Sequence, residues 1–157
     1  MADCCRTSYK SSPDIGVYAA LSVADTTTIT TGETFYAMEG TFTNTPMKEF
    51  TLIAGPYIQL TGRAGYYEID WHASVSGDSN AMEVHIGMAK NDETLTIAGE
   101  GTVGTYLKTA NEVQAVSGTR VIWLEPGDTI QIQVTADDDG DVVTVQHFTT
   151  TIARFFR

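Results

Sequence analysis

The sequence predicts an all-β sandwich or jelly roll built as one domain. Apolar and polar residues alternate along several segments, and turn-forming residues separate these segments at intervals of about 8–14 residues. The length of 157 residues suits one domain with a sizeable core. No segment has the spacing of apolar residues that marks an amphipathic helix.

The clearest strand runs from Tyr66 to Val75 and is followed by a turn at 76–80. Successive side chains of a strand point to opposite faces, so this segment has an apolar face and a mostly polar one. The apolar face carries Tyr67, Ile69, Trp71, Ala73 and Val75, and the other carries Tyr66, Glu68, Asp70, His72 and Ser74.

The second half of the chain repeats this pattern. Further strands are predicted at 82–88, 113–116, 121–124, 130–135 and from 142 toward 156, with turns at 125–128 and 137–141. Their inward positions are Met82, Val84, Ile86, Met88, Ile130, Ile132 and Val134, and their outward positions include Glu83, His85, Gln131, Gln133 and Thr135.

Residues 1–16 lack this alternation, and we predict a short extended N-terminal arm (1–16) before the β domain (17–157). A frayed terminus is the alternative interpretation. Cys4 and Cys5 are adjacent in this arm. Neighbouring cysteines seldom form a disulfide with each other, because the small ring that it would close strains the peptide bond between them. Cys4 and Cys5 are either reduced thiols or a crosslink to another chain. The residues of the arm expected to contact a partner are Cys4, Cys5, Arg6, Tyr9 and Lys10.

The charge of the chain argues against two classes of partner. It has 20 acidic and 9 basic residues and a formal net charge of −11. Nucleic acids and anionic membrane surfaces both attract clusters of Lys and Arg, so neither is an expected partner. The N-terminus has no apolar segment typical of a secretory signal, and we expect synthesis and assembly in a cytoplasm.

We predict that the protein is not an enzyme and needs no cofactor. The sequence contains no Gly-x-Ser-x-Gly elbow and no glycine-rich phosphate loop. The three histidines lie in separate strands without a partner at zinc-ligand spacing. Asp137, Asp139 and Asp141 are a weak candidate for a calcium site, but their spacing does not match an EF-hand loop. A solvated polar turn is the favoured interpretation of this run.

Three segments, in this order, resemble the tumour-necrosis-factor-like jelly roll, in the branch shared with the globular heads of the complement first component. Residues 58–67 (IQLTGRAGYY) are similar to its apolar strand, loop and Gly-x-Tyr strand opening. Residues 88–92 (MAKND) are similar to its Lys-Asn-Gly turn, with Asp92 in place of Gly. Residues 117–130 (SGTRVIWLEPGDTI) contain its Leu-x-x-Gly-Asp-x-Ile core.

The resemblance implies a homotrimer in which one sheet of each subunit packs around a threefold axis. The strand from Tyr66, the strand ending at Leu124 and the C-terminal strand would form that sheet. Ile122 and Leu124 would then point into the core and Trp123 outward, where an exposed indole suits a subunit contact. The predicted trimer interface comprises Tyr66, Glu68, Asp70, His72 and Trp123.

Threonine-rich, cysteine-poor jelly rolls without a secretory signal or a collagen-like stalk resemble bacteriophage virion proteins. The resemblance suggests a trimeric capsid decoration (cement) protein that binds the outer surface of a phage head and stabilises it. Its partners would be two further copies of itself and the major capsid protein, and its location the virion. The alternative is a receptor-binding or tail-fibre tip that recognises a host glycan or protein, with 76–80 or 98–105 as its binding loops.

Overall fold

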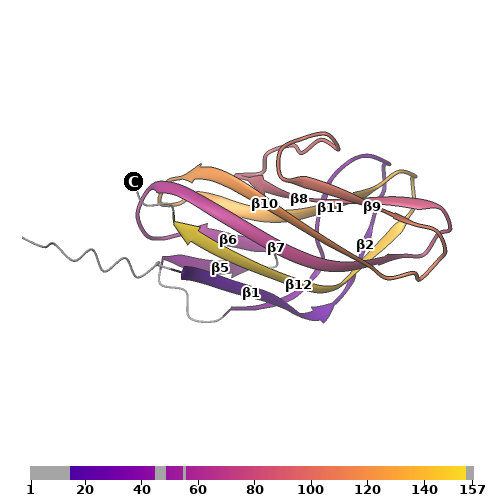
Figure 1. Cartoon of the computed structure of the whole chain (residues 1–157), viewed down its shortest axis with the longest axis horizontal. Coiled ribbons are helices and arrows are strands. Elements are labelled where there is room, and N and C mark those ends of the chain that lie inside the picture. Colours follow the sequence, from indigo (N-terminus) through magenta and orange to yellow (C-terminus); the bar gives the residue numbers. More distant parts are fainter. Residues whose placement is uncertain (1–14, 45–48, 55, 155–157) are drawn as a thin grey trace, which may run out of the picture.

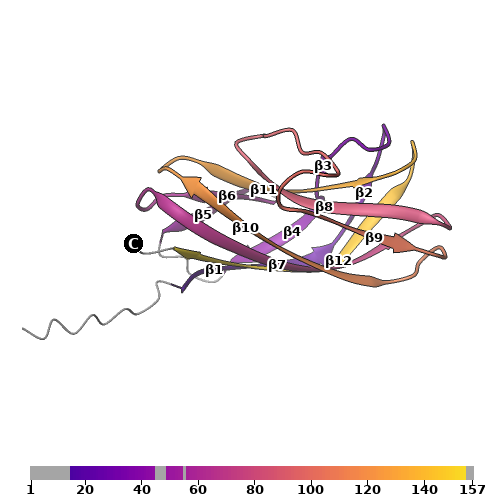
Figure 2. The same cartoon turned by 45° about the horizontal axis from the view of Figure 1, so that its top comes forward.

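The computed structural model describes residues 15–44, 49–54 and 56–154, which form two antiparallel sheets. All regular elements within these residues are strands. The strands of both sheets run along the long axis of the molecule (Figures 1 and 2). The all-β sandwich predicted from the alternation is therefore confirmed.

Each sheet has five strands in a row and one short strand at the side. Sheet A has the order β10 (Gln114–Leu124), β7 (Gly65–Gly77), β12 (Val142–Arg154), β1 (Ile15–Ala24) and β4 (Gly40–Asn44), and β2 (Thr26–Thr28) also pairs with β12. Sheet B has the order β5 (Phe50–Ala54), β6 (Tyr57–Leu60), β11 (Thr129–Ala136), β8 (Met82–Lys90) and β9 (Thr102–Leu107), and β3 (Tyr36–Ala37) also pairs with β11.

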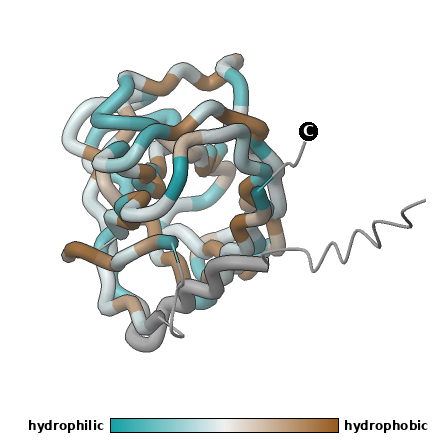
Figure 3. Tube along the Cα trace, turned by 90° about the vertical axis from the view of Figure 1, so that its left-hand side faces the viewer, coloured by the Kyte–Doolittle hydropathy of each residue, from teal (hydrophilic) through white to brown (hydrophobic). Residues whose placement is uncertain are grey.

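The core lies between the two sheets and is filled by the inward positions of the strands. The predicted apolar face of β7, from Tyr67 to Val75, is buried, and so are the four predicted inward residues of β8. Figure 3 shows the alternation of hydrophobic and hydrophilic positions along the chain. Because each strand contributes every second residue to one core, the alternation specifies which face is inside.

Three segments differ from the sequence-based expectation. The predicted strands at 113–116 and 121–124 are parts of one strand, β10, which pairs with β7 in unbroken register. The stretch at 98–105 is not wholly a loop, because β9 begins at Thr102 and pairs with β8. β9 has a weak alternation signal because most of its residues are partly or fully exposed. In addition, β7 extends to Gly77, so the expected turn starts two residues later.

The outer face of sheet B is more buried than its polar sequence suggests. His85, Gln131 and Gln133 point away from the core, as predicted, but all three are buried. An ideal Cβ on Gly104 would come within 2.5 Å of the His85 ring, so the imidazole lies directly against the β9 backbone. Gln133 donates a hydrogen bond to Gln131 over 2.9 Å, which satisfies part of the buried amide pair.

Trp71 packs at the centre of sheet A. Its ring stacks on Phe148 with a centroid distance of 6.5 Å, and Phe148 meets Phe42 edge to face at 6.2 Å. On the other side lies Gly118 of β10, where a Cβ would be 2.5 Å from Cζ2 of the indole. The lack of a side chain at 118 therefore allows β10 and β7 to pair beside a buried tryptophan.

Replacing Gly118 with alanine is expected to destabilise the fold by about 1–3 kcal/mol, because the new methyl group overlaps Trp71 within a packed core. The free energy of unfolding, measured by urea titration, should fall accordingly. Ser117→Ala is the matched control, since this exposed neighbour should change stability by less than about 0.5 kcal/mol. Equal stability of G118A and wild type would contradict this packing.

Arg120 connects the edge of sheet A to the loop that follows β8. Its Nη1 donates to the Met88 carbonyl over 2.6 Å and to Glu93 Oε2 over 2.8 Å, and Nη2 donates to Glu93 Oε1 over 3.2 Å. This two-point ion pair satisfies a guanidinium that is largely buried. The hydrogen bond from Arg120 holds the pKa of Glu93 below its usual range.

A carboxyl group whose pKa is lower in the folded state than in the unfolded state stabilises the fold at pH values above the unfolded-state pKa. This stabilisation is lost as the pH falls through the folded-state pKa. Glu93→Gln should therefore destabilise the protein near pH 7, and the difference from wild type should shrink below about pH 4. Thermal unfolding of both proteins across pH 3–7 would measure this, with Glu100→Gln as an exposed control in the same loop. A difference that stays constant across this range would exclude the ion pair as its source.

Candidate assembly surface

The face of sheet A that points away from sheet B, here called the outward face, carries all five residues predicted for the trimer contact. In the β7–β10 register, Tyr66 lies opposite Trp123, Glu68 opposite Val121, and Asp70 opposite Thr119. β7 also pairs with β12, so the three strands expected to share one sheet do so. The residues brought to the outward face are Tyr66, Glu68, Asp70, His72 and Trp123.

Tyr66, Val121 and Trp123 form an exposed apolar group, which we call the aromatic corner. Their exposed fractions are 54%, 52% and 44%. The rings of Tyr66 and Trp123 meet edge to face with centroids 5.1 Å apart. The indole N–H of Trp123 points toward Glu125 Oε1 at 3.4 Å. Large apolar side chains that are fixed and yet exposed are typical of contact surfaces.

A polar cluster at the end of sheet B holds Trp123 in place. Lys90 Nζ donates to the backbone carbonyl of Trp123 over 3.0 Å and forms a 2.7 Å ion pair with Asp128. Asn91 donates to Asp128 over 2.6 Å and accepts a hydrogen bond from the Thr129 amide over 2.8 Å. The 88–92 and 117–130 segments of the sequence therefore meet in this cluster.

Asp128 is the centre of this cluster. Partial burial alone would raise its pKa, but hydrogen bonds from Lys90, Asn91 and the Glu125 amide outweigh it and lower the pKa. The carboxylate is therefore charged at neutral pH and joins the 125–128 turn to the end of β8.

Beyond the aromatic corner the outward face is polar. The Thr119 hydroxyl donates a hydrogen bond to Asp70, which fixes this carboxylate across the β7–β10 pair. Two shallow depressions, of about 460 and 270 Å³, follow along the face and share His72 and Ser117 among their lining residues. The polar groups along these depressions can bind water, whereas the aromatic corner is mainly apolar.

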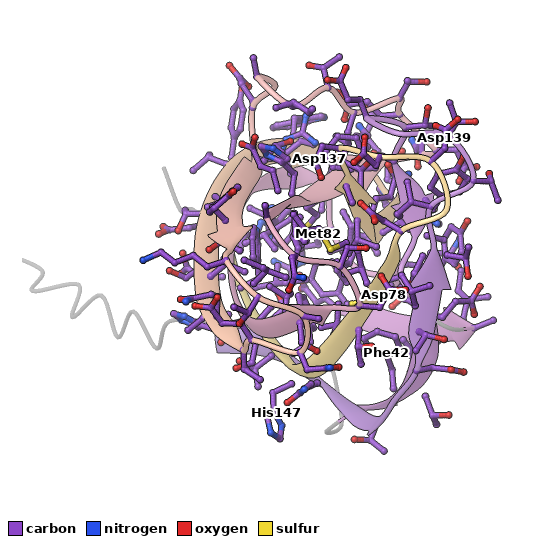
Figure 4. All side chains as sticks on the ribbon, turned by 90° about the vertical axis from the view of Figure 1, so that its right-hand side faces the viewer. Phe42, Asp78, Met82, Asp137, Asp139 and His147 are labelled. Atoms are coloured by element: carbon purple, nitrogen blue, oxygen red, sulfur yellow. The ribbon has the colours of Figure 1, made fainter. Side chains whose placement is uncertain are left out.

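His147 joins this face through a bulge that the sequence did not reveal. The register of β12 against β7 shifts between Val145 and His147, so Gln146 and His147 are both exposed. Figure 4 shows His147 projecting away from the ribbon. A bulge adds one residue to a strand and redirects the next side chain. Period-two alternation contains no signal for this extra residue.

The predicted arm residues Cys4, Cys5, Arg6, Tyr9 and Lys10 lie outside the described residues. The last two residues of the predicted arm belong to β1, which begins at Ile15. Ile15 lies opposite Ala153, and Ala153 lies opposite Glu68. The chain therefore enters sheet A at the end that carries the aromatic corner.

The three candidate metal ligands in the 137–141 loop bind different groups. Asp137 accepts a hydrogen bond from the Glu83 amide over 3.0 Å, and Asp139 accepts one from the Gly32 amide over 2.7 Å. Asp141 accepts a hydrogen bond from the Ser79 hydroxyl over 2.8 Å. Figure 4 shows Asp137 and Asp139 apart. Among the described residues no group of three or more His, Cys, Asp or Glu is placed to hold a metal ion. This loop is tied to its neighbours by its carboxylates.

The described part of the chain contains no helix long and apolar enough to cross a membrane.

Comparison by sequence finds no matching family model and no matching curated protein. Comparison by structure finds similar folds. Eiger TNF from S. frugiperda superposes with a TM-score of 0.59 at 11% identity, covering 90% of this chain and 94% of that one. Murine APRIL superposes with a TM-score of 0.55 at 10% identity, covering 88% of this chain and 98% of that one. The globular domain of zebrafish complement 1qA protein superposes with a TM-score of 0.51 at 14% identity, covering 91% of this chain and 98% of that one. The chain therefore has the tumour-necrosis-factor-like jelly-roll fold that its three motifs predicted.

Proposed function

We propose that this chain is a non-enzymatic binding and assembly module that forms a homotrimer through the outward face of sheet A. The aromatic corner is the observation that carries the proposal. Tryptophan and tyrosine contribute most of the binding energy at many protein contacts. Packing of this sheet around a threefold axis, as the family resemblance implies, would remove all three side chains of the aromatic corner from water.

The polar remainder of the face is compatible with such a contact. Asp70 already has a partner in Thr119, so its carboxylate does not have to find one across the interface. The depressions around His72 leave space for bridging waters, which are common in protein interfaces. We therefore assign the dry part of the contact to the aromatic corner and a hydrated part to the middle of the face.

Trp123→Ala and Tyr66→Ala should each weaken the trimer more than about tenfold, because truncating an aromatic residue that is buried by a contact can cost about 2 kcal/mol or more. Sedimentation equilibrium over a range of concentrations would measure the association constant. Tyr106→Ala is the matched control, because Tyr106 is 53% exposed, much as Tyr66 is, but belongs to β9 of sheet B. A monomeric wild type, or an equal effect of Tyr106→Ala, would overturn the proposal.

Within this proposal the trimer is a capsid decoration protein on the outer surface of a phage head, assembled in the host cytoplasm. The N-terminal arm would contact the major capsid protein. Two features support this role: the arm contains Arg6 and Lys10 in a chain that is otherwise strongly acidic, and it enters the sandwich beside the aromatic corner. One end of the trimer would thus present three arms to the shell.

Deleting residues 1–14 leaves β1 intact and should abolish saturable binding to assembled capsids while the trimer persists. Co-sedimentation with capsids that lack the protein would measure binding, and Tyr106→Ala would again serve as the control. Undiminished binding by the deletion variant would exclude the arm. Staining of host cells by the isolated protein, without capsid binding, would favour the receptor-binding alternative.

A further inference from the structure

A groove of about 500 Å³ lies where β2 of sheet A approaches β3 of sheet B. It is far from the aromatic corner, because β2 pairs with the start of β12, at Val142–Thr144, whereas Tyr66 lies near the end of β12. Its lining residues are Asp25, Thr26, Thr27, Thr28, Tyr36, Ala37 and Glu39.

The backbone of β2 has a free edge at this groove. Ile29 exchanges hydrogen bonds with the opposite chain, donating to the Asp141 carbonyl and accepting from the Gly140 amide. In an antiparallel pair, alternate residues direct their N–H and C=O groups toward the neighbouring strand. Thr28 therefore directs its own groups to the other side, where β2 pairs with no strand among the described residues.

The walls of the groove combine negative charge with a fixed aromatic ring. The carboxylates of Asp25 and Glu39 are exposed, and neither forms an ion pair with a described lysine or arginine. The hydroxyl of Tyr36 shares a 2.6 Å hydrogen bond with Thr30 and accepts the Thr31 amide over 3.0 Å, which holds the ring in place. A cationic side chain gains from nearby carboxylates and from an aromatic face.

We propose that this groove binds an extended basic segment of a partner protein, added as a strand to the free edge of β2. Its main chain would pair with Thr28, and its Lys or Arg side chains would lie beside Glu39, Asp25 and the ring of Tyr36. Addition of a strand at an open sheet edge supplies affinity through the main chain and specificity through alternate side chains. Charge complementarity selects the partner, because the groove is acidic within a chain of net charge −11.

A fluorescein-labelled peptide of alternating threonine and lysine, which places all lysines on one face of a strand, tests this with the full-length protein. Fluorescence anisotropy at low salt should show saturable binding that weakens as salt is added. Glu39→Gln should weaken peptide binding about two- to fivefold, which is the range for the loss of one exposed charge pair. The double variant Asp25→Asn with Glu39→Gln should weaken peptide binding roughly tenfold. Both variants should fold normally, since Asn keeps the oxygen that accepts the Thr26 amide.

Glu33→Gln is the matched control, because Glu33 is exposed in the loop between β2 and β3 but does not line the groove. A weakening by Glu33→Gln as large as that by Glu39→Gln would reduce the effect to general charge and overturn the proposal. A second probe, with the amides of alternate residues methylated, should bind at least tenfold more weakly, because it cannot add to a strand edge. Equal binding of the methylated and unmethylated peptides would exclude strand addition.

The chain itself offers one competing occupant, its own N-terminal arm, which contains Arg6 and Lys10. If the arm filled the groove, Arg6→Gln combined with Lys10→Gln would increase peptide binding, because these substitutions would remove the competitor. In that case the occupant of the groove would be the arm and not a segment of a partner protein. We expect these two substitutions to leave peptide binding unchanged. Because the readout is peptide binding, it is independent of trimer formation and of capsid binding.

Discussion

The packing of Trp71 fixes the register of three neighbouring strands, and the assembly surface depends on that register. The indole on β7 stacks on Phe148 of β12 and lies against Gly118 of β10. A shift of β10 by one residue would place a side chain where only the backbone of Gly118 fits, and a shift of β12 would remove the Phe148 ring from the stack. Either shift would also turn every outward residue of that strand inward. The exposed position of Trp123 is thus a consequence of the buried position of Trp71.

The outward face is divided into regions of different chemistry along its length. The aromatic corner lies where the chain enters β1 and leaves β12, and it has two rings in contact with each other. The middle has the Asp70–Thr119 pair and the depressions beside His72. A surface of this kind can bury its apolar end and remain hydrated elsewhere, with Asp70 in the hydrated part and Glu68, which lies opposite Val121, at the border of the apolar end.

The two ends of the sandwich carry different groups. One end has the aromatic corner and the polar cluster around Asp128, to which Lys90 and Asn91 both bind. The other has the 137–141 loop and the groove beside β2, whose exposed carboxylates lack a described cation. Because the two ends carry different groups, the proposed trimer contact and the proposed strand-binding groove would not compete for the same surface.

The motif residues in the sequence have a structural role in the described chain. Lys90, Asn91 and Asp128 hold the 125–128 turn against the end of β8 and fix the backbone of Trp123. They do not line the groove or the depressions. These three residues therefore contribute to closing the sandwich at this end, whereas Ser117, Gly118 and Thr119 of the 117–130 segment line one of the depressions on the outward face.

The sequence by itself determined the fold class, the inward face of β7 and β8, and the common face of Tyr66, Glu68, Asp70 and His72, because period-two alternation assigns each side chain to one side of a sheet. The expectation that Trp123 shares this face came from the family resemblance, which implied that its strand belongs to the same sheet, and the β7–β10 pairing bears it out. The sequence did not reveal β9, whose edge position weakens the alternation, or the bulge that exposes His147. Only the tertiary structure placed Val121 beside the two rings and β2 beside β3. These arrangements depend on pairing between residues distant in the chain, and local pattern contains no information about which distant strand supplies the neighbour.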